Sequence, residues 1–394
     1  MGFFFLRVKI INKMAILKKT GKKAAVEIQF NWIFVLIAGA VILMFFITLA
    51  GKYKDNAEQK LSYDVLSRLS AISTSGQMSS DTNTLIDVGK IRLSVGCDPY
   101  TCNEYGCSVD FDISNKGIPP PSWMSVEPFF SPGEINGDQL ITWSLDWSKP
   151  YKVLSIAYLT SPSIRYVLVY NESSASEAFA IDLSLRLKEN KNLFFVVIET
   201  NELSALKHAG ESFTKFVFLY KPVFDEDKGL NIHDSIKAKN SWDVMFIEAN
   251  DLEYGSVYFS KQTGANSKRI PDMDKSAQYF GFPLLVGAIY SDDYEFYTCN
   301  IIKLMYKYRD INTIYDKKRQ MLYDEFKNKQ GSNCAYYYGA ESREIFSKIN
   351  DSINSALELK GNNIVVSLNQ ISGLETSLDN LNTMAQRNDC PRIY

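Results

Sequence analysis

The clearest pattern in the chain is an apolar run over residues 28–50, in which none of the 23 positions carries a charged side chain. At about 1.5 Å per residue, a helix of this length covers roughly 34 Å, enough to cross the hydrocarbon layer of a bilayer. The run is longer than the apolar core of a cleaved secretory signal, and Gly51-Lys52-Tyr53 is a poor cleavage site. The pattern therefore predicts a retained transmembrane helix.

The next segment, residues 51–85, is predicted to be a stalk helix followed by a linker. Its apolar side chains recur at spacings of four, four and three, as they do on one face of a helix. These side chains are Leu61, Val65, Leu69 and Ile72. The polar segment Ser73-Thr74-Ser75-Gly76 then ends the pattern. The helix is expected to continue from the membrane and to hold the rest of the chain off its surface.

Residues 86–160 are predicted to be rich in strands. Segments 91–97 and 107–113 flank a nine-residue loop of Asp, Pro, Asn and Gly type, which predicts a hairpin. Residues 161–298 change to short, nearly continuous apolar runs, which lie at 166–170, 193–198, 216–220 and 244–247. Strands that are apolar on both faces need cover on both sides, so a layered α/β region is expected there.

The C-terminal region, residues 299–394, has the pattern of helices. Three apolar stripes extend over 301–326, 346–357 and 364–381, and the third is close to a heptad repeat. Turns at Gly331 and at 361–363 then predict an antiparallel three-helix bundle. The predicted fold class is thus α/β, or α+β overall, with an N-terminal transmembrane helix, a β-rich segment, a layered α/β domain and a C-terminal antiparallel helical bundle.

The distribution of charge orients the predicted anchor. Residues 1–27 form a basic leader with seven Lys and Arg side chains and the single acid Glu27. Because Lys and Arg are retained on the cytoplasmic side, a single-pass topology is expected, with the N-terminus in the cytoplasm and the C-terminal domain extracellular. Residues 51–394 carry 36 basic and 44 acidic side chains. This negative balance argues against a nucleic-acid partner, which requires a basic face.

The residues around Glu27 form a more specific pattern. The segment Lys22-Lys23-Ala24-Ala25-Val26-Glu27 leads directly into the apolar run, and it resembles the class III signal of archaeal type IV pilin-like proteins. In that family a basic leader is removed and a glutamate is the fifth residue of the mature chain. A cut after Lys22 places Glu27 fifth. The resemblance implies that Lys22, Lys23 and Glu27 act in processing and assembly, with Glu27 paired to the new amino terminus of a neighbouring subunit.

A plain signal anchor with an interfacial Glu27 and Trp32 is the alternative explanation of the same residues. The segment Gln29-Phe30-Asn31-Trp32-Ile33-Phe34 is also similar to the start of uncharacterised membrane proteins of small-genome archaea. A start at Met14 instead of Met1 leaves a nine-residue leader, which is the length normal for the class III signal. Both explanations place the chain among single-pass surface proteins.

All six cysteines lie beyond the predicted anchor, which is typical of three disulfides in an exported domain. Cys97 and Cys107 are expected near the facing ends of the hairpin strands, close to disulfide reach. Cys334 precedes the second C-terminal helix and Cys390 follows the third, so both are expected at one end of an antiparallel pair. The predicted pairs are Cys97–Cys107, Cys334–Cys390 and, for the remaining two cysteines, Cys102–Cys299.

A metal site is the alternative for the first three cysteines, which are spaced as Cys-x4-Cys-x4-Cys. Zinc sites usually have closer pairs and a fourth ligand nearby, and neither His208 nor His233 is close in sequence. No metal ligand and no cofactor is therefore predicted. Neither histidine lies in a catalytic motif, and the chain has no glycine motif for dinucleotides or phosphates, so no catalytic residue is predicted either.

Carboxylates follow the ends of the predicted parallel strands. Open α/β sheets bind ligands at that edge, and clustered carboxylates there bind a divalent cation or act as a paired acid and base. They are Glu172, Glu199, Glu202, Glu248 and Asp251. Two Asn-x-Ser sequons, at Asn171 and Asn350, are compatible with glycosylation at the surface.

These patterns favour a non-enzymatic envelope protein that is anchored by one helix and has a binding or assembly role. Its expected partners are the lipid bilayer and, at the cell surface, another protein or further copies of itself. The resemblance supplies an alternative, a minor or tip subunit of a type IV pilus-like filament that a prepilin peptidase processes. A membrane-anchored hydrolase or cation-binding domain is the third hypothesis, and it rests on the carboxylates.

Overall fold

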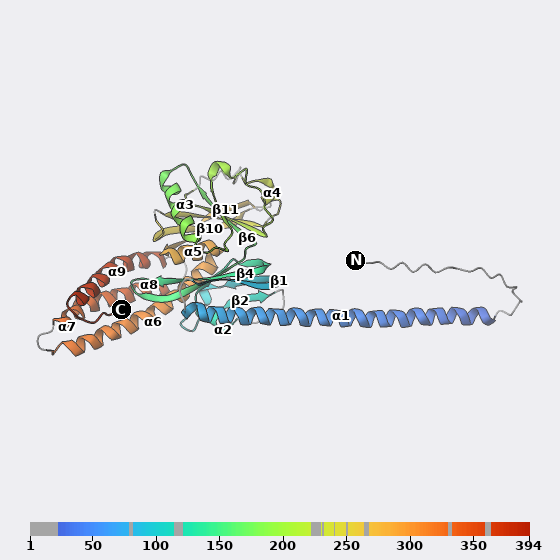
Figure 1. The fold of residues 1–394 in the computed structure, drawn as a ribbon, viewed down its shortest axis with the longest axis horizontal. Helices are drawn as coiled ribbons and strands as arrows, with labels where there is room; N and C mark the ends of the chain where they lie inside the picture. Colours follow the sequence, from blue (N-terminus) through green and yellow to red (C-terminus); the bar gives the residue numbers. More distant parts are fainter. Residues whose placement is uncertain are drawn as a thin grey trace. The chain divides into compact units, whose positions relative to one another are not determined.

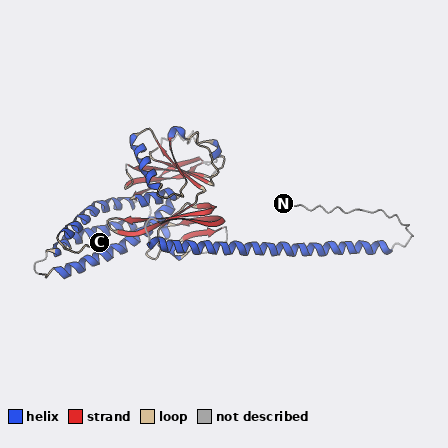
Figure 2. Ribbon diagram, in the orientation of Figure 1, coloured by secondary structure: helices blue, strands red, loops and turns tan. Residues whose placement is uncertain are grey.

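The fold is that of a computed structural model, which describes residues 23–78, 82–113, 121–221, 230, 232–239, 241–249, 251–263, 268–329, 333–358 and 364–394. The chain forms two compact units, Met1–Lys60 and Leu61–Tyr394. Helices and strands are both abundant in it (Figure 2), which confirms the α+β class expected for the whole chain.

The first helix, α1, extends from Lys23 to Met78. Its residues up to Lys60 belong to the first unit, and those from Leu61 onward belong to the second. Within the second unit, Val65 and Leu69 are buried in the main hydrophobic core. Three residues of the stripe that was predicted to form a stalk, Leu61, Val65 and Leu69, therefore pack into the second unit, where their apolar side chains are removed from water.

One sheet has five strands in the order β2, β1, β4, β5, β3. Their bounds are Val109–Ile113, Asn83–Cys97, Glu134–Ser148, Lys152–Thr160 and Phe129–Phe130. All neighbours are antiparallel except β3 and β5. The predicted hairpin is confirmed as β1 and β2, with Cys97 opposite Val109. The connections contain the short helices η1 (Pro99–Thr101) and α2 (Ser122–Val126).

The other sheet has six strands in the order β11, β10, β9, β8, β6, β7. Their bounds are Lys268–Phe280, Tyr254–Thr263, Trp242–Ala249, Phe213–Phe218, Ile164–Tyr170 and Phe195–Glu199. The strands β7, β6, β8 and β9 are parallel, whereas β10 and β11 are antiparallel. The four apolar runs at 166–170, 193–198, 216–220 and 244–247 therefore do form strands.

Both faces of the inner parallel strands β6, β8 and β9 are buried, which explains why these strands lack polar alternation. On β6, Tyr166 and Leu168 belong to the main core, whereas Val167 and Val169 belong to a second apolar cluster. Helix α3 (Ser174–Leu187) contributes to the main core, and α4 (Asp234–Lys237) contributes to the second cluster. The 3-10 turn η2 (Thr200–Glu202) follows β7.

Helix α5 (Phe282–Tyr290) contacts strands of both sheets, and Figure 1 shows it between them. It was not predicted, because a helix that is apolar on all sides has no periodic signal. After it comes α6 (Tyr294–Phe326), whose first three turns are buried. The remaining helices are α7 (Cys334–Tyr337), α8 (Ala340–Glu358) and α9 (Ile364–Arg387), with α8 in contact with both α6 and α9.

Candidate functional site

The first candidate site is the apolar part of α1. Its described side chains between residues 32 and 50 are exposed almost without exception, and Trp32 and Phe34 are more than 70 % exposed. A helix that is apolar all round and exposed to solvent is typical of a membrane span. Among the described residues, this is the one helix long and apolar enough to cross a bilayer.

The residues of the pilin-like signal lie at the beginning of this helix. Lys23 is the first residue of α1 and Glu27 is the fifth, while Lys22 lies outside the described residues. The side chains of Lys23 and Glu27 are likewise outside the described part of the chain. Processing and assembly at these residues therefore stay predictions.

The second candidate site is a cluster of sulfur atoms. The disulfides are Cys97–Cys299, Cys102–Cys107 and Cys334–Cys390. The predicted Cys334–Cys390 pair is therefore confirmed, and it joins the beginning of α7 to the segment after α9. The predicted pairs Cys97–Cys107 and Cys102–Cys299 are wrong.

The register of the hairpin explains this correction. Cys97 faces Val109 across the sheet, so Cys107 lies beyond the paired part of β2. Asn103 and Gly106 instead form a tight antiparallel bridge, which brings Cys102 and Cys107 together with a Cα–Cα distance of 4.0 Å.

Cys299 lies in the second turn of α6 and supplies the partner for Cys97. The four cysteines of the loop and α6 are referred to below as the sulfur cluster: Cys97, Cys102, Cys107 and Cys299. The Sγ atoms of Cys97, Cys107 and Cys299 all lie within 4.8 Å of one another. The Sγ atom of Cys102 is 3.6 Å from that of Cys299. In the sequence, Cys299 was linked to these cysteines only as the expected partner of Cys102, because it lies almost 200 residues after the first three.

Beside the sulfur cluster, Lys303 on α6 is buried with only 2 % of its surface exposed. Its Nζ atom donates to the backbone oxygen of Met124 at 2.6 Å and to Oδ1 of Asn300 at 3.3 Å. Burial lowers the pKa of the Lys303 amine to about 7, and the nearby carboxylate of Glu127 only partly offsets this effect. The amine satisfies a carbonyl of α2 that has no partner within that helix.

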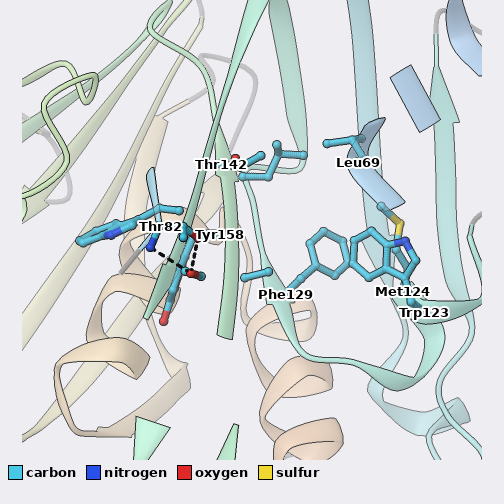
Figure 3. A pocket seen from close by; sticks show the side chains of 11 residues that line it. Leu69, Thr82, Trp123, Met124, Phe129, Thr142 and Tyr158 are labelled. Atoms are coloured by element: carbon cyan, nitrogen blue, oxygen red, sulfur yellow. Dashed lines mark hydrogen bonds between the residues drawn. The ribbon is translucent and has the colours of Figure 1, made fainter. Parts of the chain in front are cut away.

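An apolar cavity of about 30 Å³ adjoins this region (Figure 3). It is lined on several sides by aromatic and aliphatic side chains, including Leu69, Trp123, Met124, Phe129 and Tyr158. A cavity of this size holds about one water molecule and is far smaller than a site for a metabolite.

A buried charged group lies where β8, β9 and the beginning of α6 meet. Lys215 on β8 is 1 % exposed, and its Nζ atom is 3.5 Å from Oδ1 of Asp292 and donates to the backbone oxygen of Ser291. Asp243 is the register neighbour of Lys215 on β9. Burial raises the pKa of Asp292 to about 6, although Lys215 and the backbone N–H of Gly133 oppose this rise.

The two histidines have structural roles. His233 is the N-cap of α4 and accepts from the backbone N–H of Ser235. His208 lies 3.3 Å from a carboxylate oxygen of Glu211, whose other oxygen is 3.1 Å from the buried guanidinium of Arg165. The Nδ1 atom of His233 also lies 2.9 Å from the hydroxyl oxygen of Ser235, within the same helix cap.

The carboxylates predicted to line the sheet edge do not converge. Glu199 and Glu202 form a capping box at η2, and Glu248 accepts from the hydroxyl of Tyr258 at 3.1 Å. Asp251 caps the turn before β10. Among the described residues, one group has three or more potential ligand atoms within 4.8 Å of one another, and it belongs to the sulfur cluster. It contains neither Glu172 nor any other carboxylate.

The two sequons lie in different surroundings. Asn171 follows β6 and accepts from the backbone and hydroxyl of Ser173. Asn350 lies within helix α8, and Ser352 of the same sequon is 4 % exposed.

Comparison with protein-family models, with curated proteins and with solved structures finds no match for this chain.

Proposed function

We propose that this protein is a single-pass, membrane-anchored envelope protein with an extracytoplasmic domain that binds a protein partner or assembles with further copies. One observation carries the proposal: an exposed apolar helix of membrane-spanning length is continuous in sequence with a unit whose described cysteines all form disulfides. Disulfides persist in oxidising compartments and are rare in the cytosol. The basic leader supports a cytoplasmic N-terminus.

The finer architecture belongs to the same proposal. The six-stranded sheet, with helices contributing to the clusters on both of its faces, supports a layered α/β region. The disulfide between Cys334 and Cys390 brings together the segments before α8 and after α9, which supports an antiparallel arrangement of these two helices. Contacts of α8 with α6 extend this arrangement to a three-helix bundle.

The topology is tested by labelling intact cells that express the full chain with a membrane-impermeant amine reagent. Lysines of the second unit, such as Lys152 and Lys348, are about half exposed and should be labelled. Lysines of residues 1–23 should be labelled only after the cells are permeabilised. Labelling of the leader alone in intact cells would refute the proposed orientation.

The binding or assembly role is tested by cross-linking in native membranes, followed by mass spectrometry of the recovered species. The proposal expects the full chain in complexes larger than a monomer, either with itself or with another envelope protein. Recovery as an uncomplexed monomer at native expression levels contradicts a binding or assembly role.

A second candidate is a minor or tip subunit of a type IV pilus-like filament. It is favoured by the basic leader and by the position of Glu27, the fifth residue after a cut behind Lys22. A charge buried among apolar helices requires a partner, which the new amino terminus of a neighbouring subunit supplies. Mass spectrometry of the mature N-terminus separates the two candidates: a chain that begins at Lys23 supports the filament subunit, and an intact leader excludes it.

A further inference from the structure

We propose that the reduced chain binds one soft divalent cation of the zinc class through the four thiolates of the sulfur cluster, Cys97, Cys102, Cys107 and Cys299. Three of the sulfurs lie within 4.8 Å of one another, and the fourth, on Cys102, lies 3.6 Å from Cys299. Zinc–sulfur bonds of 2.3 Å place the sulfurs of a tetrahedral site about 3.8 Å apart. The sulfurs therefore occupy the volume of a tetrathiolate site once both disulfides are open.

Burial supports the same conclusion. The exposed fractions of the four residues range from 0 % at Cys299 to 8 % at Cys97. Structural zinc sites are closed in this way, with four protein ligands and no position left for water. The sequence argument against a metal was the lack of a fourth ligand near Cys97, Cys102 and Cys107, and α6 supplies that ligand in space.

The third disulfide provides a contrast within the same chain. Cys334 and Cys390 have no third cysteine, histidine or carboxylate close enough to complete a ligand group among the described residues. Two thiols alone do not form a closed tetrahedral site. A metal is therefore expected at the sulfur cluster and not at this pair.

The disulfide form of the sulfur cluster is converted to the metal-bound form in two steps, reduction and metal binding. Two molecules of a phosphine break the two S–S bonds. Each supplies two electrons and is oxidised to phosphine oxide with oxygen from water, which leaves four thiols. Binding of a divalent cation then releases four protons and leaves a site of charge −2. Lys303 lies one helical turn after Cys299 on α6, and its amine donates to the backbone oxygen of Met124.

This chemistry assigns a role to the cluster before export. Thiols remain reduced in the cytosol, where a chain is synthesised. A bound cation there holds the loop between Cys97 and Cys107 against α6. Outside the cell, molecular oxygen accepts four electrons from the four thiolates and is reduced to two waters, which releases the cation and leaves two disulfides that join the same segments. This inference does not depend on whether the domain binds a partner or assembles into a filament.

The test uses the full chain in detergent micelles, reduced with a phosphine under anaerobic conditions and titrated with Co²⁺ as a spectroscopic probe. We expect one Co²⁺ per chain, thiolate-to-cobalt charge-transfer absorption, intense tetrahedral d–d bands, and displacement by Zn²⁺. The Cys299→Ser variant should lose the tetrathiolate spectrum and bind Co²⁺ at least about tenfold more weakly. The matched control Cys334→Ser/Cys390→Ser should bind as the unmodified chain does.

A second measurement needs no substitution and so does not depend on the folding of a variant. Alkylation of the reduced, Zn²⁺-loaded chain should modify Cys334 and Cys390 first and leave the four cysteines of the sulfur cluster protected. Failure of the reduced chain to bind Co²⁺, unchanged binding in Cys299→Ser, or equal alkylation of all six cysteines would each overturn the proposal.

Discussion

At the scale of single residues, the most unusual feature is the burial of two lysines in the second unit. Lysine is almost never fully buried without a partner, because the cost of removing an ammonium from water is large. Lys303 is bonded to a backbone carbonyl and an amide oxygen, whereas Lys215 lies beside the carboxylate of Asp292. The two sites should therefore respond differently to pH and to substitution.

For Lys303, the pKa is about 7 in the folded chain and near 10.5 when unfolded. Between these values the folded state binds fewer protons than the unfolded state, so the free energy of unfolding should rise with pH. The gain in the free energy of unfolding is fully present above about pH 10.5, declines as the pH falls from there towards 7, and is lost below about pH 7. Denaturant unfolding at pH 6.5 and pH 9 should show the rise in the unmodified chain and a flatter profile in Lys303→Met.

The control for this experiment is Lys307→Met, one turn further along α6. Lys307 is 32 % exposed on its side chain and pairs with Glu127 at 2.6 Å, so its removal should cost less than about 1 kcal/mol and leave the slope between pH 6.5 and 9 unchanged. Equal slopes in Lys303→Met and the unmodified chain would refute the burial argument.

For Lys215, substitution by Met leaves the carboxylate of Asp292 without its nearest cation. The lysine is buried and the Asp292 side chain is 23 % exposed, so removal of the lysine should cost about 2 kcal/mol or more of unfolding free energy at neutral pH. The pKa of Asp292, already raised to about 6, should rise further in this variant. The free energy of unfolding of the variant is then highest below about pH 4, where Asp292 is protonated in both states, and it falls as the pH rises through the folded-state pKa of Asp292. The loss measured by denaturant unfolding should therefore be larger at pH 7.5 than at pH 5.

The exposed pair of Lys152 and Asp146 serves as the comparison for Lys215. Its atoms are 2.8 Å apart, but the lysine side chain is 49 % exposed, so Lys152→Met should cost less than about 1 kcal/mol at both pH values. If Lys215→Met and Lys152→Met lowered the free energy of unfolding by similar amounts, the buried pair of Lys215 and Asp292 would stabilise the fold no more than an exposed pair does.

At the scale of elements, the C-terminal part of α1 is part of the folded core. Val65 is 1 % exposed and Leu69 is 5 % exposed, whereas Ser67 on the same helix is exposed. A carboxylate at Val65 is removed from water without a partner, so Val65→Asp should lower the free energy of unfolding by roughly 3 kcal/mol or more. Ser67→Asp should change it by less than about 0.5 kcal/mol. Thermal unfolding of the two variants measures the difference, and equal melting temperatures would mean that this segment is a free stalk.

The predicted elements differ in how well local pattern identified them. The strands β6, β8 and β9 and the long helix α6 were found because periodicity and length are properties of a short segment. Helix α5 was missed because all of its sides are apolar and buried between the two sheets. The pairing of Cys102 with Cys107 was missed because it depends on a tight bridge whose register the sequence does not specify.

At the scale of the whole molecule, the division of the chain at Lys60 and Leu61 separates the exposed apolar helix from the compact unit. The fragment Leu61–Tyr394 retains Val65 and Leu69 and all six cysteines, so it should be soluble and folded without detergent. The full chain should require detergent and partition into membranes, because about 20 apolar residues span the hydrocarbon layer. Flotation in a lipid gradient checks both expectations, and flotation of the fragment alone would contradict them.

The sequence by itself determined the apolar helix of membrane-spanning length, the strands and the long C-terminal helices, because each depends on the order of apolar and polar residues within one segment. Only the tertiary structure decided how the four cysteines of the sulfur cluster pair, why Lys215 and Lys303 are buried, and that the carboxylates after the strands stay apart. These features join residues that are far apart in the chain, and side-chain packing and strand register bring them together. The sulfur cluster shows this most directly, since its fourth member comes from α6.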